Sequence, residues 1–466
     1  MVENPPKWCT VSISEIIEKG LRLEASVYDV DAKRAWKNVM NGKYSCVPLM
    51  GEKGLIKEAF YPGRFKRIYC DRQHGEPFFL PSQMTDVYPK TDKYISRLTR
   101  CDISKLRLER KTLLLTRSGT IGTVGYVSKT MENQVYSDDV IRVKFKHDYD
   151  LGYCYTFLKS RDGSKVLQTN GYGSVITHLE PDHLREIPVP DAPAVIREQI
   201  NECIQSSYEL RDTSNSLIDK ATDMLLKELR LPSLAELGMM DDNDAFNVPL
   251  SRLNYRLDGS YHVPVVDRIR NCLMENASEV TTLGDKRISK RIILAGIFKR
   301  TYVEEEYGYP FLGGKEICQL MPETEKFLSK AIHKERYEKE LKVEKNTILV
   351  TDRGTIGTTV MVPEHWNGYA VSQNVLKLVP ASDEIAGYIY IFLNSDIGNI
   401  LIKRHTYGSV VDMIDNNSLS AVELPLLSNQ KVQKEINDLA LQANDLRYRA
   451  YLLEKEALDI MNNEIL

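Results

Sequence analysis

The sequence contains no run of 18 or more apolar residues, and its N-terminus shows no basic segment followed by an apolar one. These absences predict a protein with neither a membrane span nor a signal peptide. The eight cysteines form no Cys-x-x-Cys pair. A disulfide framework or a zinc site would need regular cysteine spacing. We therefore expect reduced thiols and a cytoplasmic location.

Familiar catalytic motifs are missing too. There is no P-loop, no His-Glu-x-x-His and no Gly-x-Ser-x-Gly. Residues 4–8 are similar to the Asn-Pro-Pro-aromatic motif of amino-methyltransferases, but Lys7 replaces the aromatic residue and no glycine-rich cofactor loop precedes them. Asp138 and Asp139 lie near Lys144, as in some nucleases, but we interpret them as a solvated strand end. We predict no catalytic residue, no metal and no cofactor.

The net charge is −3 and the sequence pI is about 6.3. Such a balance argues against a protein that grips nucleic acid through overall basicity. It leaves open a basic surface confined to one face.

Instead of these signatures, the chain carries an internal repeat. Thr-x-x-Gly-Thr-Ile-Gly occurs at residues 116–122 and again at 351–357, an offset of 235 residues. Tyr-Gly-Ser-Val occurs at 172–175 and 407–410, with the same offset of 235. Two motifs that keep the same separation in both halves indicate a tandem duplication. Only two cysteines fall in the second copy, so disulfides do not staple a shared framework.

Each half first alternates short apolar runs with turn residues, which is typical of short strands and loops. The patterns predict a helix over 32–40, strands over 111–116, 124–127 and 140–145, and a short helix from about 152. Ile187-Pro188-Val189-Pro190 should end the first copy, because two prolines interrupt a strand.

Each half then continues into a long apolar heptad pattern, the first without glycine or proline over 194–229, about 50 Å of helix. A stripe this narrow needs a partner helix, and we expect the two helices to pair antiparallel. The predicted pairing residues of the first helix, besides smaller ones between them, are Ile196, Ile200, Leu210, Leu217 and Met224. Those of the second are Val432, Ile436, Leu439, Leu446, Leu453 and Ile460.

The predicted fold class is therefore α+β: two tandem domains of mixed short strands and helices, each followed by a long helix. The expected boundaries are 1–191 for the first domain, 192–230 for its helix, 231–247 for an acidic linker, 248–428 for the second domain and 429–466 for its helix. Side chains outside the heptad stripe, such as Tyr208, Leu226, Tyr448 and Leu452, are candidates for partner contacts or for flank packing.

The repeated glycine turn admits two interpretations. It follows a β-prone run, which favours a strand–turn–strand with glycines at positive φ. The same turn could also approach DNA, as Gly-x-x-Gly does in KH domains. Tyr-Gly-Ser is equally open to a structural or a DNA-contacting role. The candidate DNA-contacting residues are Arg117, Ser118, Thr120, Tyr172, Ser174, Arg353, Thr355, Tyr407 and Ser409.

Taken together, the glycine turns, the Tyr-Gly-Ser segments, the Ile/Leu-Pro exits and the long helices resemble the specificity subunits of type I restriction–modification systems over the whole chain. The second exit, at 424–427, departs from the pattern because Leu427 stands where the first exit has a proline. The resemblance implies two target-recognition domains that each read one half of a split DNA sequence. It also implies that the paired helices set the unread spacer, and that the subunit has no active site. The implied partners are double-stranded DNA, two methyltransferase subunits and motor–nuclease restriction subunits.

Two other functions remain open at this point. One is a protein-binding coiled-coil adaptor whose recognition domains have decayed. The other is a single-chain methyltransferase or nuclease of related type.

Overall fold

The computed structural model describes residues 10–18, 21, 23, 28–118, 121–169, 178–232, 236–237, 245–253, 256–322, 326–408 and 411–466. The chain divides into two compact units. The first unit comprises residues 1–212 and 450–466, and the second comprises 213–449. Each unit therefore contains part of both long helices.

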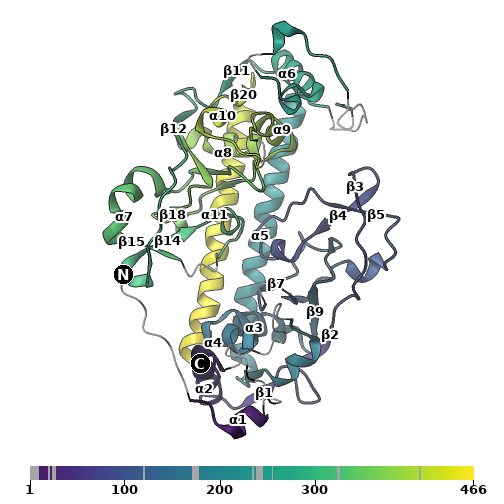
Figure 1. Ribbon diagram of the computed structural model, residues 1–466, viewed down its shortest axis with the longest axis vertical. Helices are drawn as coiled ribbons and strands as arrows, with labels where there is room; N and C mark the ends of the chain where they lie inside the picture. Colours follow the sequence, from purple (N-terminus) through teal and green to yellow (C-terminus); the bar gives the residue numbers. More distant parts are fainter. Residues whose placement is uncertain are drawn as a thin grey trace. The chain divides into compact units, whose positions relative to one another are not determined.

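In the first unit, short strands and helices precede the long helix (Figure 1). Their bounds are α1 Ile13–Glu18, α2 Val30–Met40, β1 Cys46–Pro48, β2 Ile56–Phe60, β3 Tyr69–Cys70, β4 Gly75–Phe79, β5 Tyr94–Ser96, β6 Leu113–Thr116, β7 Val124–Tyr126, β8 Val135–Tyr136, β9 Val140–Phe145, α3 Asp148–Lys159, α4 Arg161–Thr169 and β10 Pro188–Pro190. The strands form three small sheets, in the orders β2-β9-β6-β7, β3-β5-β4-β8 and β1-β10.

The second unit repeats this plan. Its elements are α6 Pro264–Asn276, β11 Glu279–Thr282, β12 Ser289–Ile293, β13 Tyr302–Val303, β14 Gly308–Leu312, β15 Phe327–Ser329, α7 Lys330–Arg336, β16 Ile348–Thr351, β17 Thr359–Met361, β18 Ala370–Val371, β19 Val375–Pro380, α8 Asp383–Asn394, α9 Asp396–Arg404, α10 Asn416–Ser420 and β20 Glu423–Leu426. The sheet orders are β12-β19-β16-β17, β13-β15-β14-β18 and β11-β20. Every strand of the first unit has its counterpart, which confirms the α+β class and the duplication.

Local sequence explains several of these elements. Asp29 caps α2, because its side chain accepts a hydrogen bond from the backbone N–H of Ala32 at 2.9 Å. Strand β6 reads Leu-Leu-Leu-Thr and is buried along its length. It lies between β7 and β9, where apolar residues are covered on both faces.

The prolines at the end of the first copy do not interrupt a strand. Pro188 and Pro190 are part of β10, which pairs antiparallel with β1 so that Pro48 faces Pro188. The expectation fails because this sheet has only two strands. Each strand has one unpaired edge, where a proline costs no ladder hydrogen bond.

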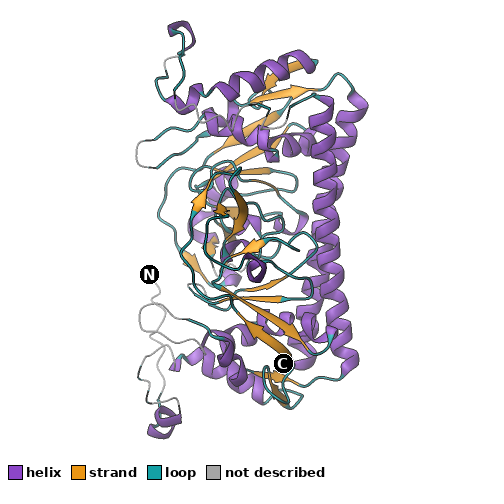
Figure 2. Ribbon diagram, turned by 90° about the vertical axis from the view of Figure 1, so that its right-hand side faces the viewer, coloured by secondary structure: helices purple, strands orange, loops and turns teal. Residues whose placement is uncertain are grey.

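The two long helices, α5 (Ala194–Glu228) and α11 (Gln430–Ile460), pair antiparallel, as the heptad patterns predict (Figures 1 and 2). In the second unit Arg447 donates to the Ser214 hydroxyl at 2.9 Å, while Lys220 lies 3.4 Å from Glu435. The contact therefore moves down α11 as it moves up α5. In the first unit the hydroxyl of Ser207 donates to the carbonyl of Ala450 at 2.8 Å.

The buried stripe of each helix differs from the predicted one at every second position. The predicted positions with fully covered side chains are Ile200, Ser207, Ser214 and Ala221 in α5, and Ile436, Ala443, Ala450 and Ala457 in α11, with Leu446 and Ile460 nearly covered. The predicted positions that are only partly covered are Ile196, Cys203, Leu210, Leu217, Met224, Val432, Leu439 and Leu453. The alternate positions are instead occupied, one residue later, by Ile204, Arg211, Ile218, Leu225, Ala440, Arg447, Glu454 and Met461.

Charge explains this one-residue displacement. A pattern built on apolar residues passes over Arg211, Arg447 and Glu454, which are buried because they find partners. The Arg211 guanidinium pairs with Glu454, and Arg447 donates to Ser214 and Asn215. Buried charge is tolerated where it is paired.

The four side chains proposed for partner contacts differ in exposure. Tyr208 is only 8% exposed, because its ring stacks on Tyr126 at 4.4 Å and meets Tyr155 edge-on. The expectation of an exposed Tyr208 is therefore wrong. Leu226 and Tyr448 are partly covered, and Leu452 is exposed.

A glycine lets a second helix approach each long helix closely. Gly152 of α3 donates its N–H to Asn201 of α5 at 3.0 Å. Gly387 of α8 donates to Asn437 of α11 at 2.8 Å, and a Cβ at Gly387 would lie 2.2 Å from the Asn437 carbonyl oxygen. The same contact occurs in both units, so it belongs to the duplicated plan.

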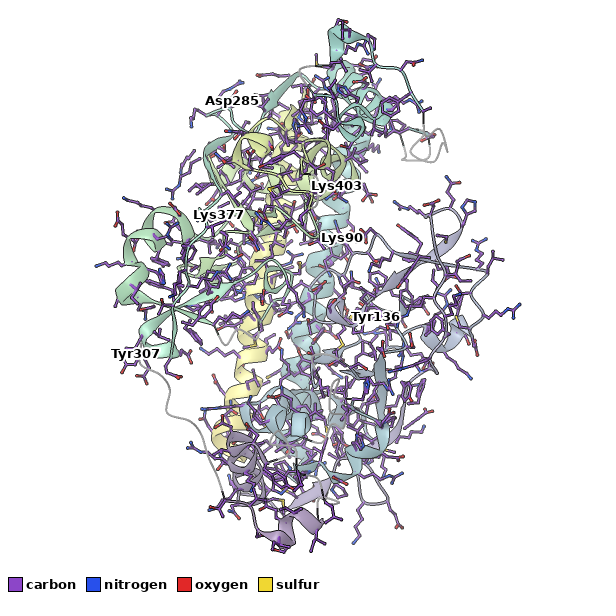
Figure 3. All side chains as sticks on the ribbon, in the orientation of Figure 1. Lys90, Tyr136, Asp285, Tyr307, Lys377 and Lys403 are labelled. Atoms are coloured by element: carbon purple, nitrogen blue, oxygen red, sulfur yellow. The ribbon has the colours of Figure 1, made fainter. Side chains whose placement is uncertain are left out.

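A cation lies buried in the central strand of each four-stranded sheet next to the glycine turn. Arg142 of β9 donates to the carbonyls of Leu106 at 3.2 Å and Tyr136 at 3.1 Å. The equivalent residue of β19 is Lys377, labelled with Tyr136 in Figure 3. Burial, with help from Arg291, lowers the pKa of Lys377 to about 7.

This lysine predicts a pH-dependent stability. Because the pKa of Lys377 is lower in the folded chain, the unfolded chain binds more protons between pH 7 and about 10.5. The free energy of unfolding should therefore rise by about 2 kcal/mol from pH 7 to pH 9. In Lys377→Met this rise should disappear, as measured by urea unfolding at both pH values. An equal rise in both proteins would contradict the prediction, and Lys290→Met, an exposed neighbour on β12, is the control.

Among the described residues, no single helix is long and apolar enough to cross a membrane, although α8 and α9, which meet at 80°, would pass by length and composition as a bent pair. The apolar character of α8 has another cause, because its residues from Ala386 to Leu393 are buried inside the second unit. The described part of the chain holds no cluster of side chains able to bind a metal, and its seven cysteines are unpaired.

Candidate nucleic-acid interface

The repeated Thr-x-x-Gly-Thr-Ile-Gly segment forms a tight turn between two strands of each unit, β6–β7 and β16–β17. In both copies the first threonine closes the turn. The hydroxyl oxygen of Thr116 accepts from the N–H of Thr123 at 3.1 Å, and that of Thr351 accepts from Thr358 at 3.1 Å. The structural role of the turn is therefore present in both units.

The last glycine of the turn serves two purposes. Gly122 has φ +83° and Gly357 has φ +84°, in the left-handed region that favours glycine. A Cβ on Gly357 would also lie 2.6 Å from the amide nitrogen of Asn399 in α9. The turn is thus pressed against the helix behind it, and this fixes the direction in which its tip points.

In the first unit, Arg117 is buried beside the turn rather than exposed. It is 5% exposed, its guanidinium lies 4.3 Å from the ring of Tyr61, and it pairs with Glu180 and, at 3.7 Å, with Asp139. Burial alone would lower the pKa of Arg117, but Glu180 outweighs burial and raises it. In this conformation the charge of Arg117 holds the turn to its neighbours.

The second unit reverses the order of charges at this place. Asp352 occupies the position of Arg117 and is fully buried, and its carboxylate accepts from Arg353 at 2.7 Å. Hydrogen bonding to Asp352 raises the pKa of Arg353, whose side chain remains 36% exposed. Arg353 therefore presents a cation at the surface of the second unit.

The other candidate residues divide into three groups. Ser118 shares a hydrogen bond of 2.8 Å with His178 and is partly covered. Thr355 and Tyr407 are exposed, and burial together with Asp415 raises the pKa of the Tyr407 hydroxyl. The candidates that lie outside the described residues are Thr120, Tyr172, Ser174 and Ser409.

Asp138 is not the solvated strand end expected of it. It is 3% exposed and accepts from Arg67 at 2.6 Å, because the chain after β2 brings that arginine over it. Burial alone would lower the pKa of Arg67, but Asp138 outweighs it and raises the pKa. Lys144 lies elsewhere, paired with Glu109 at 2.6 Å, so no nuclease-like cluster is formed by these residues.

Sequence reasoning missed the contact that Arg67 makes. The corner between β8 and β9, residues 137–139, binds Arg67, and its counterpart in the second unit binds Arg300, which donates to Gln373 at 2.6 Å. The same corners hold the glycine turns: Arg117 N–H donates to the Asp139 carbonyl at 3.0 Å, and Asp352 N–H to the Asn374 carbonyl at 3.2 Å. In each unit one corner therefore joins the turn to the loop that follows β2 or β12.

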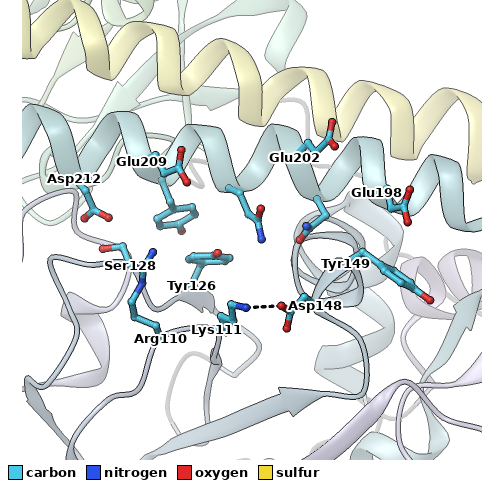
Figure 4. Close-up of a pocket in the computed structure, with 13 residues that line it drawn as sticks. Arg110, Lys111, Tyr126, Ser128, Asp148, Tyr149, Glu198, Glu202, Glu209 and Asp212 are labelled. Atoms are coloured by element: carbon cyan, nitrogen blue, oxygen red, sulfur yellow. Dashed lines mark hydrogen bonds and ion pairs between the residues drawn. The ribbon is translucent and has the colours of Figure 1, made fainter.

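A groove of about 480 Å³ lies elsewhere in the first unit, along α5 (Figure 4). Two cations line it, Arg110 and Lys111. Five carboxylates line it as well: Asp148, Glu198, Glu202, Glu209 and Asp212. A surface with this excess of negative charge repels the phosphates of DNA, so we place the candidate interface at the turns and not at this groove.

The second unit matches a known family. Residues 294–439 match the family model described as Type I restriction modification DNA specificity domain. The match covers the glycine turn, the Arg300–Gln373 contact and the start of α11. No curated protein matches the chain.

Several solved structures align over most of the chain at low similarity. They include the S subunit of a type I restriction-modification system from M. genitalium, with 14% identity over 90% of this chain and 97% of that one and a TM-score of 0.30. The HsdS subunit from Thermoanaerobacter tengcongensis aligns with 11% identity over 89% and 98% and a TM-score of 0.27. A chain from a study of type I R-M complex assembly aligns with 12% identity over 87% and 98% and a TM-score of 0.28. Scores this low do not establish an equivalent fold.

Proposed function

We infer, from a second unit that belongs to the type I restriction modification DNA specificity domain family, that this chain is the DNA sequence-recognition subunit of a type I restriction–modification system. The match of residues 294–439 is the observation that carries this conclusion. Subunits of this kind recognise DNA and are not catalytic. The absence of familiar catalytic motifs from the sequence agrees with that role.

We propose further that the first unit is a second recognition domain. The family match does not reach it, but its three sheets have the same strand orders as those of the second unit. The glycine turn, the corner behind it and the glycine contact with a long helix are also repeated. Two domains on one plan, with different exposed residues, fit a target in two unlike halves, and 1–191 and 248–428 remain our proposed boundaries.

The paired helices supply the proposed spacer element. A helix of 35 residues, as α5 is, extends about 50 Å, which corresponds to roughly 15 base pairs. We propose that this length sets the number of unread base pairs between the half-sites. We also propose that the chain positions two methyltransferase subunits, and through them motor–nuclease subunits, on the DNA.

Methylome sequencing tests the function. Deleting the gene in its host should abolish methylation at one bipartite motif, with no change at other methylated motifs, because the methyltransferase subunits would lose their sequence reader. Restoring the intact chain should restore that motif.

Two results would overturn the proposal. An unchanged methylome, combined with no sequence-dependent DNA retention in a gel shift with the methyltransferase subunits, would favour a protein-binding adaptor. Methyl transfer by the purified chain alone would establish a single-chain enzyme.

A further inference from the structure

A third repeated motif lies on the loop that the two corners anchor. Gly63-Arg64-Phe65-Lys66-Arg67 follows β2, and Gly296-Ile297-Phe298-Lys299-Arg300 follows β12. The offset here is 233 residues, two fewer than for the glycine turns. Only the second residue differs between the copies. We call these segments the first and second basic loops.

Both basic loops present the same residues to solvent. In each, the glycine, the variable residue and the lysine are exposed, whereas the phenylalanine and the arginine are partly covered. Phe65 packs on the core cluster of Phe78, Ile95 and Leu106. Phe298 packs on the cluster that contains Phe311 and Tyr337.

The arginine of each loop fixes its second end. Arg67 binds Asp138, and Arg300 binds Gln373, at equivalent positions of the β8–β9 and β18–β19 corners. The contact is kept although an ion pair in one unit is a neutral hydrogen bond in the other. A loop held at both phenylalanine and arginine loses little conformational entropy when it binds a ligand.

The exposed side chains of the loops are not used by the protein itself. Lys66 and Lys299 make no ion pair or hydrogen bond with the described residues, and neither does Arg64. Ile297 is 87% exposed, which leaves a branched apolar side chain on a polar surface. An unpaired lysine in one position and a variable residue beside it form a pattern suited to a ligand with a constant part and a changing part.

Charge around the loops favours a polyanion. Residues 56–112, from β2 to the start of β6, hold 13 lysines and arginines but 7 aspartates and glutamates. The equivalent residues 289–347 hold 12 and 10. The net charge of −3 for the whole chain therefore hides a basic segment in each unit.

We propose that the two basic loops are DNA contacts, in which Lys66 and Lys299 bind backbone phosphates while Arg64 and Ile297 meet base edges. This inference rests on the proposed function and assigns residues to it. The constant lysine suits the phosphate, which is the same at every base pair. The variable residue suits the bases: an arginine pairs with the major-groove edge of guanine, and an apolar side chain contacts the methyl group of thymine.

The test uses the chain in complex with its methyltransferase subunits and measures the Kd for DNA against salt concentration. Lys66→Ala and Lys299→Ala should each weaken binding several-fold on target and random DNA alike. Each should also reduce the slope of log K against log salt by about 1, and the double variant by about 2. Lys431→Ala, an exposed lysine in the first turn of α11, is the matched control and should change neither value.

The variable position has its own readout. The single exchange Ile297→Arg should change the preferred base at one position of one half-site in the methylome and leave the other half-site unchanged. Arg64→Ile should do the same for the other half-site.

The outcomes separate the two proposals. If the intact complex binds DNA sequence-specifically while the lysine variants keep the full salt slope, or both exchanges leave the motif unaltered, the basic loops are not DNA contacts although the proposed function stands. If the intact complex shows no sequence-dependent binding, the proposed function fails and this inference fails with it.

Discussion

Replacing Glu454 with glutamine is expected to lower the free energy of unfolding of the first unit by about 3–5 kcal/mol. The carboxylate is 1% exposed, and it accepts from Tyr155 and Lys159, both at 2.8 Å, and from Arg211. Glutamine keeps the size of the side chain but removes its charge. Two cations would then stay buried without a counter-ion, which is the costly way to break a buried ion pair.

The same carboxylate predicts how stability responds to acid. Burial alone would raise the pKa of Glu454, but Lys159 and Arg211 outweigh burial and lower it to about 2. Its contribution is therefore fully present above the unfolded pKa of about 4.5 and is lost as pH falls from there towards 2. Urea unfolding followed by circular dichroism at pH 7 and pH 3.5 should show a smaller loss with pH in Glu454→Gln.

Glu456→Gln, an exposed carboxylate on the same helix, is the control and should change stability by less than about 0.5 kcal/mol. A loss below about 1 kcal/mol in Glu454→Gln would mean that the cluster contributes little net stability.

Gly387→Ala should destabilise the second unit by about 3 kcal/mol, against the usual trend in helices. Alanine is ordinarily the better helix former by about 1 kcal/mol. Here the added Cβ would lie 2.2 Å from the Asn437 carbonyl and would push α8 away from α11. The hydrogen bond from Gly387 N–H to Asn437 would then lengthen as well.

Gly152→Ala is the matched variant in the first unit, since its Cβ would lie 2.7 Å from the Cα of Asn201. Gly259→Ala, with nothing within 4 Å of its Cβ, is the control. Thermal unfolding of the three variants checks the prediction. A rise in Tm for Gly387→Ala would show that the two helices separate without cost.

Periodicity predicted the long helices and their antiparallel pairing but not the full set of buried positions. Residues such as Leu210 and Leu217 suit an apolar stripe, yet they are only partly covered. Arg211 and Glu454 lie deeper because each neutralises the other, and a sequence alone does not reveal that partnership. The covered face is also widened by contacts with α3 and α8, which belong to the domains and not to the helix pair.

The glycine turns were found from sequence because their offset is constant, and the basic loops were missed because theirs is not. Between β5 and β6 there are 16 residues, whereas 18 separate β15 from β16, where α7 lies. This difference moves every upstream motif out of the register of 235. The shared Gly-x-Phe-Lys-Arg pattern was nonetheless visible to a search that allowed a short insertion.

Arg117 and Asp138 illustrate a different limit. Each looked like a surface charge beside a turn, and each is buried. Both are covered because Tyr61, Arg67 and Glu180, distant in sequence, converge on them. Such convergence depends on the tertiary fold, so local patterns of charge do not predict it.

The small sheets β1-β10 and β11-β20 have a consequence for how such proteins diversify. Each pairs the strand that opens a unit with the strand that closes it, so that Cys46 faces Pro190 and Glu279 faces Leu426. The segment between the paired strands therefore starts and finishes at one place. Genetic recombination at these two points would transplant a whole reading module as a cassette, leave the long helices uninterrupted, and give the host a new target in a single event.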